Sequence, residues 1–231
     1  MKQLIYIFAG ASSAMAVAAM KVLQGQGHKI IGISRSEENP GYDEFYNVGS
    51  YTLAAFPKVE GAVNGLVYFP GTINLKPFNR ISEADFTSDF AINALGAAAF
   101  VQAYLPGLKN AETASIVLFS TVAVATGMQF HASVAMAKGA VEGLTRSLAA
   151  EFAPKIRVNC IAPSLTDTPL AEKLLSSAEK TDAGKNRNPL KHIGTTQDIA
   201  GAVTFLLGEN ANWITGQVLA VDGGMGAVRL L

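Results

Sequence analysis

Residues 138–163, KGAVEGLTRSLAAEFAPKIRVNCIAP, contain the change of hydrophobic period that decides the fold. The first half belongs to a segment, 133–152, in which apolar residues recur at the spacing of one helix face. These residues are Ala137, Val141, Leu144 and Leu148. The second half, 156–163, is an apolar, β-rich run of strand length. A helix that leads directly into a buried strand is typical of an α/β protein.

The same alternation extends along the whole chain. Six further β-rich runs are separated mostly by helix-like stretches. They are QLIYIFAG (3–10), HKIIGISR (28–35), EFYNVGS (44–50), GLVYFPG (65–71), SIVLFST (115–121) and QVLAVDGG (217–224). This alternation predicts an α/β fold with a doubly wound parallel sheet and helices on both faces. No repeat or linker interrupts it, so we expect one domain over residues 1–231.

A second helix is predicted over residues 82–105. Ser82 and Asp85 suit its N-terminal cap, and Pro106 is expected to end it. Alanine and glycine are abundant on this helix and on 133–152, which indicates close packing within the fold or between subunits.

The composition restricts the class of protein. Hydrophobic residues make up 49% of the 231 residues and charged residues 16%, which suits a sheet buried on both faces. The net charge is zero and no basic run occurs, so we expect no nucleic-acid partner. Neither a membrane span nor a signal peptide is evident, which favours a cytoplasmic location without a membrane partner. The one cysteine, Cys160, excludes an internal disulfide and is expected in the core.

The first strand is followed by residues 9–16, AGASSAMA, and an alanine-rich helix. The first strand–helix turn of such a sheet is a place for a pyrophosphate, which approaches the backbone closely. We expect cofactor contacts here, from Gly10, Ser12, Ser13 and Met15. Ala14 and Ala16 stand where a glycine-rich loop has its later glycines, and an alanine is strained where φ is positive. Taken alone, the stretch fits an ordinary small-residue turn equally well.

The second strand ends in Arg35 rather than in an acidic residue. An acidic residue favours the free ribose hydroxyls of NAD, whereas arginine suits a 2′-phosphate. The sequence therefore favours NADP(H) over NAD(H). The alternative is that Arg35 is a solvated loop cation.

Several long, ordered segments together resemble the short-chain dehydrogenase/reductase family. They are KGAVEGLTRSLAAE (138–151) with RVNCIAP (157–163), NPLKHIGTTQDIA (188–200) and GQVLAVDGG (216–224). The resemblance covers nearly the whole chain. It implies a Rossmann-like sheet of about seven parallel strands, a nicotinamide cofactor and a homodimer or homotetramer.

The resemblance implies matches for most of the family's catalytic residues, but not for all of them. The lysine matches Lys138, and a helical asparagine that helps to hold a proton-relay water matches Asn93. The serine that hydrogen-bonds the substrate oxygen falls on Thr121, with Ser120 beside it. The family's tyrosine, four residues before the lysine, falls on Val134, which has no proton to give or take.

The resemblance also assigns cofactor contacts. Thr168 matches a threonine that contacts the nicotinamide amide, and Pro163 matches the proline of the family's Pro-Gly turn, in which Ser164 stands here in place of the glycine. Asn47 stands where an acidic residue often contacts adenine. The family's Asn-Asn-Ala-Gly after the fourth strand reads YFPG (68–71) here, which puts the bracing of the central sheet in doubt.

Four groups are candidates for the missing proton donor. His131 is the nearest titratable side chain to Val134, and a histidine could act as an acid near neutral pH. Lys138 could act through a water molecule, although ribose binding alone is the simpler role. Tyr68 and Tyr104 are expected in the core or at an interface. The other histidines form no pair with metal-ligand spacing, so no metal is expected.

Residues 165–197 form a polar segment between the last two strands, called the lid segment below. It is expected to lie over the carboxyl ends of the strands and to close over the ligands, with 169–180 as one short helix. Gly127, Met128 and Phe130 are expected to give the substrate pocket apolar walls.

The sequence thus predicts an NADP(H)-dependent oxidoreductase that transfers hydride between nicotinamide and a carbonyl compound or secondary alcohol, with a non-standard proton donor. The alternative is a catalytically impaired NADP-binding protein that acts as a sensor or assembly subunit. A structural protein without a nucleotide is the least favoured. The helices 82–105 and 133–152 and the apolar segment 224–231 are the expected subunit interfaces.

Overall fold

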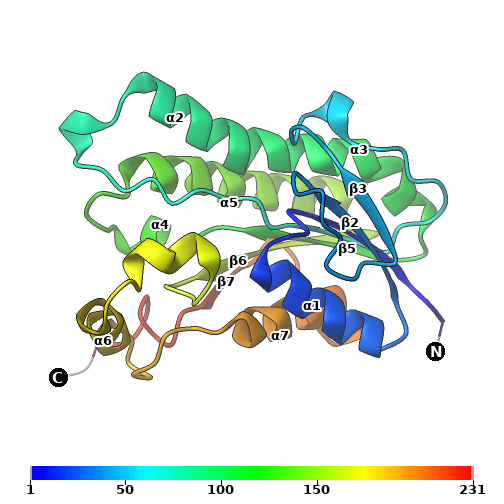
Figure 1. Cartoon of the computed structure of the whole chain (residues 1–231). Coiled ribbons are helices and arrows are strands. Elements are labelled where there is room, and N and C mark those ends of the chain that lie inside the picture. Colours follow the sequence, from blue (N-terminus) through cyan, green and yellow to red (C-terminus); the bar gives the residue numbers. More distant parts are fainter. Residues whose placement is uncertain (1, 230–231) are drawn as a thin grey trace.

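A seven-stranded parallel sheet forms the centre of the protein in the computed structural model, which describes residues 2–229 (Figure 1). The strands are β1 (Ile5–Ala9), β2 (Lys29–Ser34), β3 (Glu44–Asn47), β4 (Gly65–Tyr68), β5 (Ala114–Phe119), β6 (Ile156–Pro163) and β7 (Val218–Val221). Their order is β3-β2-β1-β4-β5-β6-β7. The order reverses between β1 and β4, which are paired, and ligands bind at such a reversal, outside the carboxyl ends of the strands. The predicted Rossmann-like sheet is confirmed.

Helices cover both faces of the sheet. On one face lie α1 (Ala14–Gly25) and α7 (Thr196–Leu207), and on the other lie α3 (Gly96–Asn110) and α5 (Ala132–Phe152) (Figure 1). Each face has its own buried apolar cluster, because side chains alternate between the two faces of a strand. Cys160 is fully buried in one of them, and burial raises the pKa of its thiol to about 12, so the predicted core role is confirmed.

The helix predicted over 82–105 is longer than expected. It runs through α2 (Glu83–Phe90), a π-helical turn (Ala91–Leu95) and α3 without interruption. The predicted Ser82–Asp85 capping box is present. By length and composition this helix could cross a membrane, but half of its most apolar window is buried inside the protein. The apolar side chains of this helix therefore contribute to the hydrophobic core.

Pro106 does not end this helix, so that prediction was wrong. Pro106 lies inside α3, which continues to Asn110. Proline removes one backbone hydrogen bond, but the next turn is held by tertiary packing. Leu108 is fully buried, and the Val63 amide donates to the Gly107 carbonyl at 2.9 Å.

The lid segment contains two helical pieces rather than one. A 3₁₀ helix spans Pro169–Leu174, and α6 spans Ala178–Arg187. Ser177 separates them because its backbone is extended and its hydroxyl accepts from the Lys180 amide as the cap of α6. Between β5 and α5 lies one more short helix, α4 (Ala123–Thr126). Of the predicted interface segment 224–231, residues 230 and 231 lie outside the described residues.

Candidate active site

The turn from β1 to α1 can be formed only with glycine at its first position. Gly10 has φ of +70°, and a Cβ atom there would lie 2.9 Å from Cδ of Pro70. Both facts require glycine at this position. Ala14 and Ala16 lie within α1, and neither has a positive φ, so neither alanine is strained. The Ser13 hydroxyl accepts from the Ala16 amide at 3.2 Å and caps the helix.

The first amides of α1 can meet an anion. The N–H groups in the first turn of a helix have no partner in the helix itself, and Ser13 takes only the third of them. The amides of Ala14 and Met15 are thus free of intrahelical bonds. Met15 also lines the cavity described below, so the turn and the cavity are continuous.

Arg35 and Asn47 lie at the same edge of the sheet as this turn. Asn47 is the register partner of Ser34, the residue before Arg35. The guanidinium of Arg35 lies 5.5 Å from the centroid of the Tyr51 ring, which orients it. The Ser34 hydroxyl donates to the Ser12 hydroxyl at 2.9 Å, which links the first turn to the second. An anion beside Arg35 would therefore meet a preset group of cationic and hydroxyl side chains.

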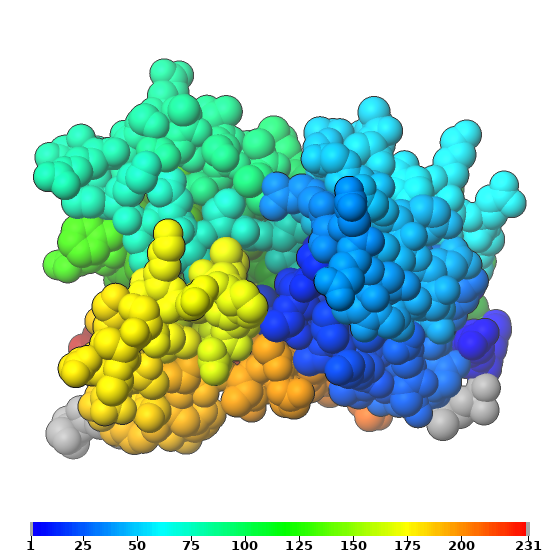
Figure 2. Space-filling model, viewed as in Figure 1, coloured from blue at the N-terminus to red at the C-terminus, as the bar shows by residue number. Residues whose placement is uncertain are grey.

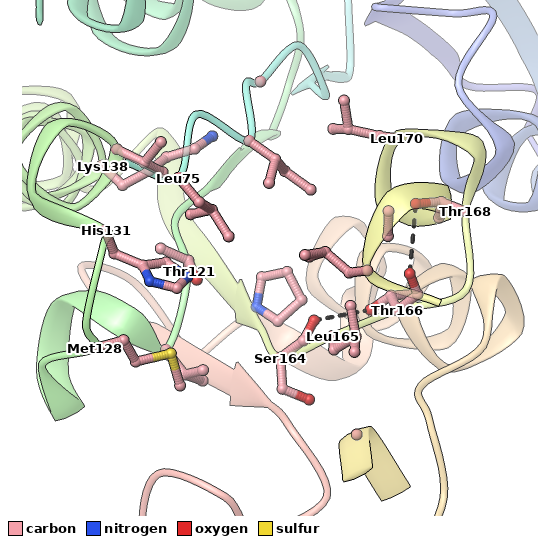
Figure 3. Close-up of a pocket in the computed structure, with 18 of the residues that line it drawn as sticks. Leu75, Thr121, Met128, His131, Lys138, Ser164, Leu165, Thr166, Thr168 and Leu170 are labelled. Atoms are coloured by element: carbon pink, nitrogen blue, oxygen red, sulfur yellow. Dashed lines mark hydrogen bonds between the residues drawn. The ribbon is translucent and has the colours of Figure 1, made fainter. Parts of the chain in front are cut away.

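A cavity of about 460 Å³ lies beyond the carboxyl ends of β4, β5 and β6. It brings together nine residues that the sequence analysis singled out: Met15, Ser120, Thr121, Met128, His131, Val134, Lys138, Pro163 and Thr168. Figure 3 shows Lys138, His131 and Thr121 on one side, opposite Thr166 and Thr168. The surface is hollowed between the lid segment, in yellow, and the blue N-terminal segments (Figure 2). Gly10, Ser12, Ser13, Arg35 and Asn47 do not line the cavity but lie along the same sheet edge.

Lys138 is a buried cation at the wall of this cavity. Its side chain is 7% exposed, and Nζ donates to the Phe119 carbonyl at 2.9 Å. Burial lowers the pKa of Lys138 to about 8, because the charged form loses hydration. A group with this pKa can both hold and release a proton near physiological pH.

Asn93 lies close to Lys138 across Gly71. A Cβ atom at Gly71 would be 3.3 Å from Lys138 Nζ and 3.4 Å from Asn93 Oδ1. Asn93 Nδ2 donates to the Asp89 carbonyl at 2.7 Å, within the π-helical turn region. Asn93 Oδ1 is buried and has no donor among the described residues, which fits a hydroxyl of a water molecule or a ribose.

Ser120 and Thr121 both line the cavity, but their hydroxyls differ in whether the proton is already donated. Ser120 is buried, and its hydroxyl donates to Glu142 at 2.8 Å. The Thr121 hydroxyl accepts from the Ala123 amide at 3.3 Å, so its proton stays available for a ligand oxygen.

The two tyrosines considered as donors have structural roles. Tyr104 is buried and donates to the Pro57 carbonyl at 2.8 Å, and Tyr68 donates to the Ile92 carbonyl at 2.7 Å. A Cβ atom at Gly96 would lie 2.1 Å from the Tyr68 hydroxyl, so glycine is needed there. Tyr68 therefore braces β4 against the long helix, in the altered YFPG segment. The expected core roles of both residues are confirmed.

His131 lines the cavity just before α5 begins. Its Nδ1 lies 2.7 Å from the Gln129 carbonyl, which requires a proton on Nδ1. In the neutral ring Nε2 is then an acceptor, and only the charged ring has a second proton to give. Val134, one turn before Lys138, is 5% exposed and also lines the cavity.

The expected apolar walls come mostly from other residues. Of the three predicted residues only Met128 lines the cavity, and Phe130 is 53% exposed with φ of +68°. Phe130 is thus largely exposed and is not among the residues that line the cavity. The apolar walls are Phe69, Ile73, Leu75, Leu165, Leu170 and Leu174.

The sequence analysis missed a buried carboxylate next to the cavity. Asp89 is 2% exposed and accepts hydrogen bonds from the hydroxyls of Thr72 and Ser133. Asp89 lies one helical turn before Asn93, and Ser133 directly precedes Val134. That spacing was the available signal. Among the described residues no group of histidines, cysteines and carboxylates could hold a metal ion.

Comparison with known proteins decides the family. Residues 43–226 match the family described as enoyl-(acyl carrier protein) reductase. The chain is 32% identical over 209 residues to tropinone reductase-like 3 of Erythroxylum coca, covering 89% of this chain and 77% of the relative. The protein belongs to the short-chain dehydrogenase/reductase family.

Two further comparisons agree with this family. The chain is 33% identical over 183 residues to 2-(S)-hydroxypropyl-CoM dehydrogenase 3 of Xanthobacter autotrophicus, covering 76% of this chain and 72% of the relative. The ligand-free structure of an aldohexose dehydrogenase from Thermoplasma acidophilum superposes with a TM-score of 0.91 at 25% identity, over 100% of this chain and 96% of that one. The protein is thus an oxidoreductase of the short-chain family with the seven-stranded fold of that family.

Proposed function

We propose that this short-chain dehydrogenase/reductase is an NADP(H)-dependent enzyme that acts on a ketone or secondary alcohol without the usual tyrosine. The observation that carries the proposal is the one cavity that joins Lys138 and Thr121 to the start of α1 through Met15. The two relatives, which are named as a reductase-like protein and a dehydrogenase, support the same reaction class.

Three residues have defined roles in this reaction. The nicotinamide supplies or accepts a hydride when it is bound. The Thr121 hydroxyl donates to the substrate oxygen and fixes the carbonyl. Lys138 donates to a ribose hydroxyl and raises the positive potential of the cavity, while Asn93 Oδ1 holds a hydroxyl beside it. The apolar walls favour a substrate with hydrophobic groups next to the reacting carbon.

The lid segment completes the site. Thr168 lines the cavity, and its hydroxyl donates weakly to the Thr166 carbonyl at 3.4 Å, so it is free to turn to a nicotinamide amide. Leu170 and Leu174 follow it on the 3₁₀ helix and face the same space. We propose that this part closes over the cofactor and substrate and excludes water.

Purified protein should oxidise NADPH in the presence of some members of a panel of hydrophobic ketones. The loss of NADPH absorbance measures the reaction, and the reverse reaction with secondary alcohols and NADP measures it independently. A thermal shift with NADP but no turnover with any member of the panel would contradict this proposal. It would favour the impaired, cofactor-binding alternative instead.

Replacing Arg35 with alanine should weaken NADPH binding about tenfold or more and leave NADH binding nearly unchanged. A charge-assisted hydrogen bond contributes about 1.5–3 kcal/mol, and only NADPH has a 2′-phosphate to receive it. Dissociation constants for both cofactors, measured by fluorescence titration, test this. Arg80→Ala, at an exposed arginine outside the cavity lining, is the matched control. Equal loss for both cofactors would contradict the assigned role of Arg35.

A further inference from the structure

Asp89 is a buried carboxylate that neither the core nor the cofactor turn requires. It is 2% exposed and forms no ion pair within residues 2–229. Three neutral side chains donate to it: Thr72 at 2.7 Å, Asn74 at 3.4 Å, and Ser133. A buried carboxylate is costly even when it is hydrogen-bonded, so its position beside the active site calls for a reason other than stability.

Thr72 connects this carboxylate to the cavity. Its hydroxyl donates its one proton to Asp89 Oδ1 and accepts from Asn93 Nδ2 at 2.9 Å. A hydroxyl oxygen has two lone pairs, so one acceptor position remains. Thr72 lines the cavity together with Thr121, Val134 and Lys138. A substrate hydroxyl in the cavity can therefore donate to Thr72.

Ser133 ties the same carboxylate to α5. It is fully buried and directly precedes Val134, the residue at the position of the family's tyrosine. Asp89 is thus fixed by a loop residue before α2 and by the helix that carries Lys138. The hydroxyls of Thr72 and Ser133 both donate to this one carboxylate.

We propose that Thr72 and Asp89 form the proton relay that replaces the tyrosine in this protein. In alcohol oxidation the substrate O–H bond breaks, and its proton passes to Thr72 Oγ1 as the Thr72 proton passes to Asp89 Oδ1. The substrate carbon loses its hydride to the oxidised nicotinamide, so the alcohol is oxidised and the cofactor reduced. In carbonyl reduction the same protons move in the opposite direction. Thr72 is then a catalytic residue, and Asp89 acts through it as a positioning residue. This inference rests on the proposed function.

Lys138 and His131 differ from Thr72 because neither donates to a buried carboxylate. Lys138 Nζ donates to the Phe119 carbonyl, and the His131 Nδ1 proton is directed to the Gln129 carbonyl. Ser120 also donates to a carboxylate, that of Glu142 at 2.8 Å, but Glu142 is only partly buried. Thr72 joins the cavity to the fully buried carboxylate of Asp89 through a single hydrogen bond.

Thr72→Val, which keeps the shape and removes the hydroxyl, should lower kcat at least tenfold and leave the KM for NADPH within about twofold. Thr72→Ser, which keeps the hydroxyl, should retain activity within a few-fold of the wild type. Asp89→Asn should lower kcat as Thr72→Val does. If Thr72→Val does not fold, as judged by its melting temperature, Asp89→Asn gives the same readout.

Two outcomes would overturn the relay alone. They are unchanged kcat in Thr72→Val, and an equal loss in Thr72→Ser and Thr72→Val, which would indicate shape rather than the hydroxyl. Wild-type protein without turnover on any carbonyl or alcohol would overturn the proposed function and the relay with it. The wild-type measurement therefore separates the two failures.

Discussion

Replacing Lys138 with methionine is expected to lower kcat by about a hundredfold or more. Methionine fills a similar volume but donates no hydrogen bond, so the ribose hydroxyl and the substrate oxygen lose the buried cation. Lys138 is 7% exposed, and its Nζ is fixed at the cavity wall by its hydrogen bond to the Phe119 carbonyl. Steady-state reduction of the best ketone with NADPH measures the effect.

The pH dependence of the wild type provides a second readout for Lys138. Burial lowers its pKa to about 8, so the ammonium form predominates below that pH and is lost as the pH rises through it. Ketone reduction should therefore decline above about pH 8, and the residual activity of Lys138→Met should lack this decline. Lys21→Met, at an exposed position on α1, is the matched control. Unchanged kcat in Lys138→Met would remove Lys138 from the mechanism.

The melting temperature of Lys138→Met helps to separate chemistry from folding. The substitution removes a buried charge, whose desolvation is unfavourable, but leaves the Phe119 carbonyl without its donor. These effects oppose each other, so we expect little net change in stability. A large loss of kcat at a nearly unchanged melting temperature would then report on the reaction itself.

The sheet and the lysine helix could be predicted because their signals are local. Each strand is a continuous apolar run, and the spacing of Val134 and Lys138 on α5 follows from helix geometry alone. The relay could not be predicted in this way. Thr72, Asp89 and Ser133 come from a loop, α2 and α5, and only the packing of α2 against α5 brings them together.

The errors at Pro106 and in the lid segment have a related cause. A proline normally ends a helix, but burial of Leu108 extends α3 beyond it. In the lid segment, Ser177 lies within the stretch 169–180 that was predicted as one helix. Its hydroxyl instead caps the N-terminus of a new helix, α6. In both places tertiary contacts or side-chain capping outweigh the pattern of apolar residues.

Val134→Tyr is expected to raise kcat about a hundredfold. Val134 lies one turn before Lys138 on α5 and lines a cavity of about 460 Å³, so the introduced phenol can enter the cavity on the lysine's face of the helix. A general acid beside the substrate oxygen typically contributes 10²- to 10⁴-fold, and the nearby ammonium would lower the pKa of the phenol. Val134→Phe, which has the ring without the hydroxyl, is the control. An equal gain in Val134→Phe, or no gain in Val134→Tyr, would contradict the expectation.

The same variant tests whether Thr72 and the introduced tyrosine perform one task. If both deliver the substrate proton, Thr72→Val should matter much less once Val134→Tyr is present. The loss of kcat on Thr72→Val should fall from at least tenfold in the wild-type background to about twofold in the Val134→Tyr background. Such non-additivity is expected only for groups that act on the same step. Equal losses in the two backgrounds would show that Thr72 supports the site in some way other than proton transfer, because a second donor would then leave its role unchanged.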